Sequence, residues 1–420
     1  MPLIGTRGAA SSRGFGQFGN VESAPFIVMV QAGSGLFGAK LFEDGSLLVG
    51  VYNGGGISQW TVLATGTHSP GTTRQINTFS DFYTSQSSPT SAAGTLAYNE
   101  AFARVDRQNN TLAAKVVQNG FAWGGSPGAS TAYVESTGDT FLANGLYATS
   151  GSTATTPHIV KINSAGSIVA NRNMSIDPAY NSTEYVYACS ADTSNVYVVT
   201  SEGIWRLPAS LGGATLYIPT GYSGAGMVSN IAIDNSGDIY FMSSDATNNG
   251  TTLFKYSAGF GAKLFSVCLS GVYLNGSYNA SVGIDPTTQE PYWLIGTGSS
   301  TAKIIKTSAS LVPQFARDIS LSGGLFGAGN WKDVQVVGNL IAFRNQYAQM
   351  AFVFPKNGAK TGTYSVGGAT VSYSSVSLPS YSSVGAAWAT NAAYSTTRSF
   401  TITNASITTG TAFTVASLNL

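Results

Sequence analysis

The chain has two histidines, His68 and His158, which stand ninety residues apart. A histidine-based metal centre or charge relay needs several polar groups that converge, so these two residues offer little for either. His158 follows Thr-Thr-Pro and precedes an apolar run, which favours a turn or a strand-edge position. His68 lies in the segment Gly-Thr-His-Ser-Pro-Gly, which is typical of a loop. We therefore predict no metal or catalytic role for either histidine.

The segment 234–238, Asp-Asn-Ser-Gly-Asp, places oxygen-bearing side chains around a glycine, as calcium ligands require. Its spacing differs from that of an EF-hand, because no glutamate stands at the twelfth position. Asp and Asn beside Gly are also the usual residues of a tight turn. We favour the turn, and we interpret Glu43-Asp44 and Asp285-Pro286 in the same way. The sequence predicts no metal and no cofactor.

Acidic residues number 19, so a pair of carboxylates such as a glycosidase uses can exist. No local motif singles out such a pair. The glycine-rich segments 323–329 and 53–58 lack the Lys-Ser/Thr step and the strand-to-helix context of a phosphate-binding loop. The sequence therefore predicts no catalytic residue and no enzyme.

Tyrosine is abundant, with 21 residues, and several tyrosines lie outside alternating segments and near Asn, Ser or Gly. A flat ring contacts a partner at low entropic cost while its hydroxyl group makes hydrogen bonds. Packing between repeat units is the alternative use of these rings. The tyrosines that we assign as candidate contacts to sugars or proteins are Tyr83, Tyr222, Tyr273 and Tyr278.

The composition indicates which scaffold positions these residues. Charged residues make up 9% of the chain and hydrophobic residues 43%, and glycines number 50. Long helices normally draw on Glu and Lys for their solvent faces, so this chain favours strands joined by Gly, Ser, Asn and Thr turns. The net charge of +1 gives no field that would attract nucleic acid or anionic lipid. No run of eighteen apolar residues predicts membrane insertion.

Cys189 and Cys268 each stand in an apolar, strand-like run, which predicts buried free thiols, with a disulfide as the alternative. Residues 1–20 contain no continuous apolar stretch of the kind found in secretory signals. We therefore expect synthesis in the cytoplasm. A low-charge β protein of this kind is typical of a virion component that is assembled in the host cytoplasm and released when the host lyses.

A repeat runs through most of the chain. Its clearest copy, residues 158–168, combines an apolar-Lys-apolar step with a turn of Asn, Ser and Gly and a second apolar run. Neighbouring copies are 45 to 64 residues apart, close to the roughly 40 to 50 residues of a four-stranded propeller blade. The basic residues that mark the seven copies are Lys40, Arg104, Lys161, Arg206, Lys255, Lys306 and Lys356.

A second strand-turn-strand element precedes the basic residue in several copies, most clearly at 231–241 and 282–294. Its apolar-Asp-turn-apolar-Tyr-apolar pattern resembles the hairpins of NHL-like β-propellers, and the resemblance implies the architecture alone. We predict an all-β chain in which residues 25–366 form a β-propeller of seven four-stranded blades. A β-solenoid or a series of β-sandwiches is the alternative, which the repeat spacing disfavours.

Residues 1–24 have almost no apolar periodicity, which predicts either a frayed tail or an extended arm that orders against another subunit. The Gly-Thr-Arg-Gly-Ala and Arg-Gly-Phe-Gly runs within residues 5–16 resemble the beginning of tail and fibre proteins of tailed bacteriophages. This resemblance implies a virion-attachment arm. The residues that we expect to make its apolar and charged contacts are Ile4, Arg7, Arg13, Phe15 and Phe18.

Residues 367–420 are rich in Ser, Thr, Ala and Tyr and contain no acidic residue. Segments 398–403 and 411–416 alternate strictly, which predicts strands. They form either an added β module or strands that close the ring.

These features together predict a non-enzymatic structural protein of a tailed phage virion, either a tail or fibre appendage or an exterior decoration. Its partners would be other virion proteins, reached through the arm, and it would be present in many copies. A contribution to host adsorption through a surface glycan fits the tyrosines. The alternative is a propeller-type lectin, or a glycan hydrolase or lyase. No nucleic acid partner is expected.

Overall fold

The structure is a computed structural model of the 420-residue chain. It describes residues 26–30, 35–41, 47–52, 57–63, 76–84, 98–106, 111–118, 130–134, 136–147, 155–180, 183–220, 228–274, 279–323, 331–345, 348, 350–398, 401–404, 408–409 and 413–417. The attachment-arm residues Ile4, Arg7, Arg13, Phe15 and Phe18 lie outside these ranges, as do His68, Tyr222 and Tyr278.

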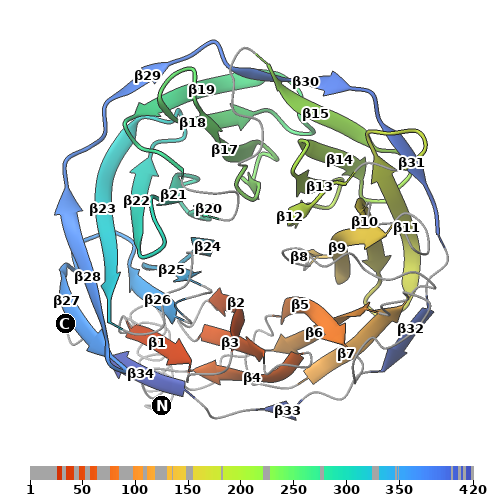
Figure 1. The fold of residues 1–420 in the computed structure, drawn as a ribbon, viewed down its shortest axis with the longest axis horizontal. Helices are drawn as coiled ribbons and strands as arrows, with labels where there is room; N and C mark the ends of the chain where they lie inside the picture. Colours follow the sequence, from red (N-terminus) through yellow and green to blue (C-terminus); the bar gives the residue numbers. More distant parts are fainter. Residues whose placement is uncertain are drawn as a thin grey trace, which may run out of the picture.

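The described part of the chain is entirely β-structure, as its Gly-rich and charge-poor composition predicts. Its strands form seven sheets, which Figure 1 shows arranged around a common centre. The described residues contain no helix that is long and apolar enough to cross a membrane.

Four of the sheets each contain four strands that follow one another in the chain, paired in antiparallel order from the centre outward. The first is β8 (Ser130–Val134), β9 (Asp139–Tyr147), β10 (Thr155–Ile162) and β11 (Ile168–Ser175). The second is β12 (Val186–Ala191), β13 (Asn195–Thr200), β14 (Ile204–Pro208) and β15 (Thr215–Thr220). The third is β16 (Ala232–Ile233), β17 (Ile239–Asp245), β18 (Gly250–Tyr256) and β19 (Lys263–Ser270). The fourth is β20 (Ala280–Ile284), β21 (Pro291–Gly296), β22 (Thr301–Thr307) and β23 (Pro313–Ser322).

Strand β1 (Phe26–Val30), the first of the described strands, adds to the sheet of the last repeat unit. It pairs with β26 (Met350–Pro355), which follows β24 (Trp331–Val337) and β25 (Leu340–Asn345). Residues more than 320 positions apart thus share one sheet, with Phe26 opposite Val353. This sheet therefore joins the beginning of the repeat region to its end.

The two remaining sheets have three consecutive strands each within the described residues, and a strand from the C-terminal part of the chain is the fourth strand of each sheet. They are β2 (Gly35–Leu41), β3 (Leu47–Tyr52) and β4 (Ile57–Leu63), and β5 (Ile76–Thr84), β6 (Tyr98–Asp106) and β7 (Thr111–Gln118). Lys40 lies in β2, the innermost strand of its sheet, and so it does not mark the position that the other basic residues mark. Lys161 in β10, Lys255 in β18 and Lys306 in β22 lie in the last strand but one of their units.

The remaining strands run around the outside of the seven sheets. A hairpin of β27 (Gly362–Val366) and β28 (Ala369–Val376) adds to β23, so the predicted domain boundary at residue 366 falls at the turn of this hairpin. The later strands each add to one further outer strand, in reverse chain order. They are β29 (Tyr381–Ser383) on β19, β30 (Ala387–Asn391) on β15, β31 (Tyr394–Thr396) on β11, β32 (Thr401–Asn404) on β7, β33 (Thr408–Thr409) on β4 and β34 (Phe413–Ser417) on β1.

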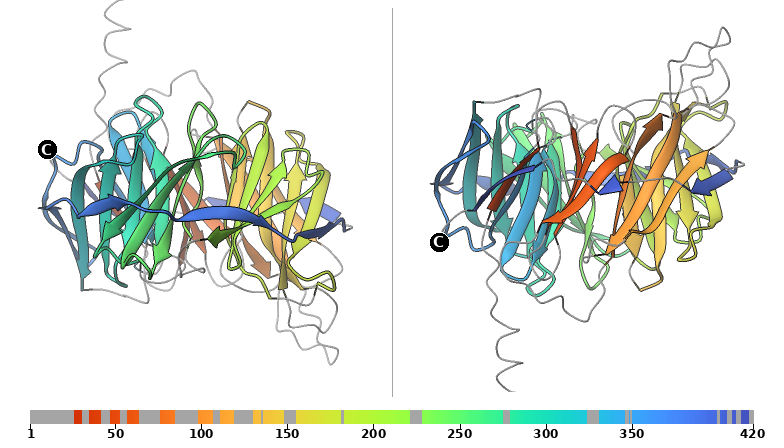
Figure 2. Two further views of the ribbon diagram at one scale, coloured as in Figure 1. Left: turned by 90° about the horizontal axis from the view of Figure 1, so that it is seen from above. Right: turned by 90° about the horizontal axis from the view of Figure 1, so that it is seen from below.

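We call strands β28 to β34 the C-terminal belt. It makes one circuit of the molecule, because β34 at its end contacts β27 beside its beginning. Figure 2 shows the belt crossing the outer wall of the sheets. Of the belt strands, β33 alone pairs in the parallel direction. The strands expected within 398–403 and 411–416 correspond to β32 and β34, whose partners lie far away in the chain.

Apolar side chains fill the spaces between neighbouring sheets. In one such space, Tyr240 of β17 and Trp293 of β21 lie with their ring centroids 6.5 Å apart. In the next, Trp331 of β24 packs in one cluster with Leu294 of β21. The sheets of β12–β15, β16–β19, β20–β23 and β24–β26 each contribute to two such clusters, so none of these four holds a core by itself. Cys189 and Cys268 are buried thiols that form no disulfide, as predicted.

Candidate functional site

The connections between strands lie at two opposite ends of the sheets, because neighbouring strands run in opposite directions. One end carries the connections from first to second and from third to fourth strands, among them 136–138, 163–167, 192–194, 209–214, 234–238, 257–262, 285–290 and 308–312, together with 356–361 between β26 and β27. We call it the ion-pair end. The other carries 176–180, 183–185, 201–203, 246–249, 271–274 and 297–300. We call it the tyrosine end.

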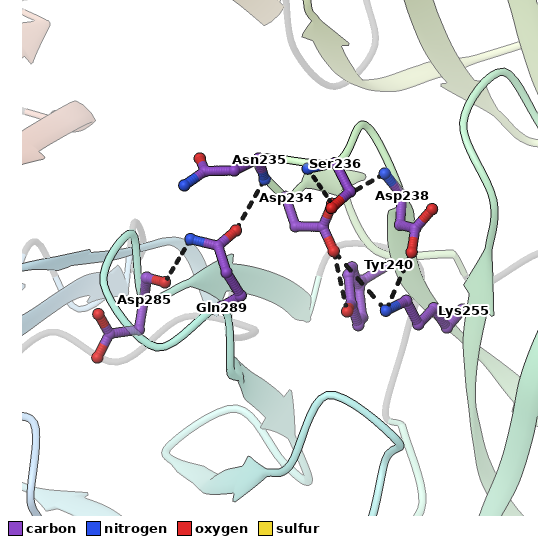
Figure 3. Close-up of polar contacts among 8 residues, drawn as sticks. All are labelled: Asp234, Asn235, Ser236, Asp238, Tyr240, Lys255, Asp285 and Gln289. Carbon is purple, nitrogen blue, oxygen red and sulfur yellow. Dashed lines mark hydrogen bonds and ion pairs between the residues drawn. The ribbon is translucent and has the colours of Figure 1, made fainter.

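The Asp234–Asp238 segment at the ion-pair end is a hydrogen-bonded turn between β16 and β17 (Figure 3). Asp234 Oδ1 accepts hydrogen bonds from the backbone N–H groups of Ser236 and Asp238, each at 2.9 Å. Gly237 has φ of +80°, the left-handed conformation that glycine adopts at low cost. Asp234 Oδ1, one of the oxygen atoms that suggested a calcium loop, is thus bound to backbone donors of the same turn.

Lys255 of β18 occupies the space beside this turn (Figure 3). Its Nζ lies 3.1 Å from Asp238 Oδ2 and 3.7 Å from Asp234 Oδ2, and 4.9 Å from the centre of the Tyr240 ring. Burial works against the charged ammonium group, but Tyr240 and Asp238 raise the pKa of Lys255 above its usual value. The two carboxylates are therefore paired with one cation rather than presented to a substrate.

The same arrangement recurs in neighbouring sheets. Lys161 Nζ lies 2.9 Å from Asp139 Oδ2 and 5.5 Å from the centre of the Phe141 ring. In the β20–β23 sheet, Lys306 pairs with Glu290 at 2.5 Å and lies over Tyr292. Each lysine thus pairs with an acid at the start of the second strand and lies over the aromatic ring two residues later.

Arg206 of β14 is a variant of this arrangement, since its Nε donates to Asn195 Oδ1 at 2.9 Å and it pairs in register with Tyr197. The sequence carried a signal for these contacts that the basic residues alone did not reveal. It is a polar residue followed two positions later by an aromatic one, as in Asp139-Thr-Phe141, Asn195-Val-Tyr197, Asp238-Ile-Tyr240 and Glu290-Pro-Tyr292.

Polar groups also join neighbouring sheets at the ion-pair end. The backbone N–H of Asn235 donates to Gln289 Oε1 at 2.7 Å (Figure 3). Lys356 Nζ lies 2.6 Å from Asp285 Oδ2. Burial alone would raise the pKa of Asp285, but Lys356 and two backbone N–H donors lower it below its usual value. These contacts tie adjacent sheets to one another.

Two arginines make a second kind of link between sheets. Arg172 of β11 donates from Nε to the carbonyl oxygen of Leu211 at 2.8 Å, and Arg317 of β23 donates from Nε to that of Gly358 at 2.8 Å. Leu211 and Gly358 both have positive φ, at 57° and 68°. The fourth strand of one sheet thus contacts the last turn of the next sheet.

The tyrosine end exposes aromatic rings. Tyr273 is 51% exposed and Tyr185 is 38% exposed. Tyr185 is held by its backbone N–H, which donates to Ser201 Oγ at 3.1 Å. Tyr273 is the one predicted contact tyrosine whose side chain the structure describes. Tyr83 lies within β5, so its predicted position outside a strand is wrong.

His158 lies in the middle of the β8–β11 sheet, so the predicted turn or strand-edge position is wrong. Its register partners are Asn144 in β9 and Asn173 in β11, and its side chain is completely buried. Burial and the charge of Arg398, which follows β31, lower the pKa of His158 from 6.5 to about 3. The ring is therefore neutral at ordinary pH. The short apolar stretch after Pro157 did not reveal that this strand lies between β9 and β11.

Lys332 in β24 has a strongly shifted pKa. Burial and the neighbouring charge of Arg344 lower this pKa to about 8, while Asp333 opposes the shift. Lys332 and Arg344 are direct register partners, and Asp333, at φ of 59° in a β-bulge, pairs with Arg344. Gln335 in the same strand donates from Nε2 to the carbonyl oxygen of Ala39 at 2.7 Å. This part of β24 therefore faces the β2–β4 sheet and contributes to packing between sheets.

Within the described residues, no three His, Cys, Asp or Glu side chains are grouped so that they could hold a metal ion. What the arrangement provides is a set of ion pairs at one end and, at the other, aromatic and polar loops that also carry Asp177, Glu184 and Glu202. No protein-family model matches the chain, and no curated protein matches it either.

Proposed function

We propose that this chain is a non-enzymatic structural protein of a tailed phage virion, a seven-bladed β-propeller attached to the particle by residues 1–24. In this proposal it serves as a tail or fibre appendage or as an exterior decoration. Other virion proteins are its partners, and it is present in many copies.

The propeller assignment is supported by the order of the sheets. Consecutive units pair their strands from the centre outward, and the first strand, β1, completes the sheet of the last unit. This is the usual way for a ring of blades to avoid free sheet edges. The two units with three strands of their own are completed to four strands by β32 and β33 of the belt.

The belt is the observation that carries the structural role. Each of its strands covers the outer edge of a different sheet, so that opening the ring requires the belt to detach. A protein that works outside the cell has no chaperones to refold it, so resistance to opening is a useful property of a virion surface component. The ion pairs at the ion-pair end also support a structural role, because Asp234, Asp238 and Glu290 each pair with a lysine.

The geometry also supports a role in adsorption to the host. The chain enters β1 at Phe26, which lies near the ion-pair end because it is paired with Val353, close to the end of β26. A particle that holds residues 1–24 would thus lie toward the ion-pair end, and the exposed Tyr185 and Tyr273 would point away from it. Weak contacts to a neutral host glycan, repeated over many copies, add up by avidity.

Mass spectrometry of purified virions tests the proposal. We expect the chain in particles made by a phage that encodes it, and immunogold labelling to place it on the outside of the tail or capsid. A chain without residues 1–24, supplied in trans during infection, is expected to stay out of the particles, while the full chain supplied in the same way enters them. Particles that lack the chain would rule out the proposal.

A glycan array combined with a reducing-sugar assay tests the adsorption role and separates it from enzymatic functions. Retention of a neutral glycan without release of reducing ends is the expected result. Turnover of the glycan would instead establish a hydrolase or lyase, and no retention at all would leave a purely architectural role.

A further inference from the structure

Strand β1 is unusual because it pairs on one side with β26, the last strand of the repeat, and on the other side with β34, the last strand of the belt. It pairs with β26 through four residue pairs, from Phe26 with Val353 to Met29 with Met350. It pairs on its other side with β34 through five residue pairs, from Phe26 with Ser417 to Val30 with Phe413. The first strand of the fold is therefore an inner strand of its sheet, and the last strand is the edge.

We infer that the C-terminal belt is a mechanical lock on β1, so that a pull on residues 1–25 is carried by two antiparallel ladders instead of one. This inference rests on the proposed function, because the attachment arm is the segment through which a particle would pull. Bearing this load is a second role for the belt, in addition to covering the edges of the sheets.

The direction of the load follows from the register. The hydrogen bonds of an antiparallel ladder lie perpendicular to the strands, so a pull along β1 loads all bonds of a ladder together in shear. A pull that leaves from Phe26 at the ion-pair end, against an anchor at the tyrosine end, acts along β1. Both ladders resist that pull at the same time.

The β34 ladder resists only because β34 is itself held. The strand before it in the belt, β33, pairs with β4 through Thr408 and Thr409, and the earlier belt strands pair with five further sheets. The load that β1 places on β34 therefore passes into the outer strands of the other sheets. The belt spreads around the ring a force that enters at one strand.

Optical tweezers test this inference on the isolated full-length chain. One handle is attached to residue 1 or to residue 420, and the other to Ser299→Cys, which lies in the exposed β21–β22 connection at the tyrosine end. Pulling from residue 1 loads two ladders of β1, whereas pulling from residue 420 loads the single ladder between β34 and β1. We expect a higher rupture force from residue 1 than from residue 420.

The double variant Thr414→Pro/Val415→Pro removes ladder bonds of β34, because proline has no backbone N–H to donate. We expect it to shorten the lifetime of β1 at constant force from residue 1 about tenfold or more. The matched control is Ala389→Pro/Thr390→Pro in β30, which weakens the belt at β15 and leaves the β1 ladders intact. The control is expected to shorten the lifetime from residue 1 much less than the β34 variant does, because β31, β32 and β33 still hold β34.

A cross-linked variant keeps the test decisive if the prolines prevent folding. Val28 and Val415 are direct register partners, so Val28→Cys/Val415→Cys can join the two strands. Oxidation is expected to raise the rupture force from residue 1 above that of the reduced sample. Equal forces from residues 1 and 420, an unchanged lifetime in the β34 variant, or no effect of the cross-link would each overturn the inference. Absence of the chain from virions would overturn the proposed function and leave these forces as measured.

Discussion

Lys356 Nζ lies 2.6 Å from Asp285 Oδ2, and this ion pair joins the last unit of the ring to the unit before it. The Asp285 side chain is 1% exposed, so its charge depends on the lysine and on the backbone donors of Thr287 and Thr288. It is the most deeply buried carboxylate among the ion pairs of the described residues.

Replacing Lys356 with methionine is expected to destabilise the protein by about 2 kcal/mol, because it leaves a buried carboxylate without its cation. Urea denaturation at pH 7 measures the loss. The matched control is Lys303→Met, whose partner Asp318 is 42% exposed. An exposed pair contributes about 1 kcal/mol or less, so equal losses for the two variants would contradict the prediction.

The same ion pair gives an acid dependence. The pKa of Asp285 is lowered in the folded state, so its contribution is fully present above the unfolded value of about 4. It is lost as the pH falls through the lower folded value. We expect the stability difference between the parent and Lys356→Met to shrink below about pH 4. A difference that stays constant down to pH 2 would show that the carboxylate is not the group involved.

His158 makes a second pH dependence. Its pKa falls from 6.5 to about 3 on folding, because the buried ring is costly to charge beside Arg398. The unfolded chain therefore binds a proton that the folded chain does not, so stability is fully present above pH 6.5 and falls as the pH drops toward 3. The expected slope is roughly 1.4 kcal/mol per pH unit.

Urea denaturation between pH 7 and pH 4.5 measures this slope in the parent, in His158→Gln and in His68→Gln. The slope is expected to disappear in His158→Gln, whatever the absolute stability of that variant, and to remain in His68→Gln. Retention of the slope in His158→Gln would assign it to another group.

Gly250 provides a test of the close packing between β18 and β19. A Cβ atom at this position would lie 2.1 Å from the carbonyl oxygen of Leu269, so alanine must push the two strands apart. We expect Gly250→Ala to cost about 3 kcal/mol. Gly213→Ala is the control, because nothing lies within 4 Å of its Cβ position, and its effect should stay within about 0.5 kcal/mol. A thermal or urea melt that ranks them the other way would refute the packing argument.

The tyrosine end can be tested by adsorption. Tyr185→Ser/Tyr273→Ser removes two exposed rings from that end, and we expect virions that carry it to adsorb to host cells several-fold more slowly, because weak contacts add over many copies. Tyr381→Ser is the matched control, since Tyr381 is 48% exposed but lies on the belt at the outer wall. Equal adsorption of the parent, Tyr185→Ser/Tyr273→Ser and Tyr381→Ser particles would contradict a role of the tyrosine end in adsorption.

Much of the ring could be predicted because its hairpins are local. The turn at Asn163–Gly166 and the turn at Asp234–Asp238 each join strands that are neighbours in the chain, so alternation and turn residues were sufficient. The predicted strands on either side of both turns are confirmed. The basic residue that marks the repeat was misassigned at Lys40. An apolar-Lys-apolar step also occurs in an innermost strand, where the lysine needs no acid and no aromatic ring beside it.

The candidate site was less predictable. The sequence identified Lys161, Lys255 and Lys306 as repeated positions, but it did not reveal their partners, because the pairing of lysine with acid and ring occurs across strands. His158 was misplaced for a related reason, since its position inside the sheet depends on pairing with β9 and β11, and its lowered pKa depends in part on Arg398, which lies 240 residues later.

By itself, the sequence determined that the chain is β-structure with a repeat and that its two ends differ from that repeat, because composition, alternation and turn chemistry act over a few residues. Only the tertiary structure decided that Phe26 lies between Val353 and Ser417 and that the C-terminal strands surround the sheets in reverse order. A strand edge accepts any extended segment through its backbone groups, so the pairing of β34 with β1 leaves no signature in the side chains of either strand.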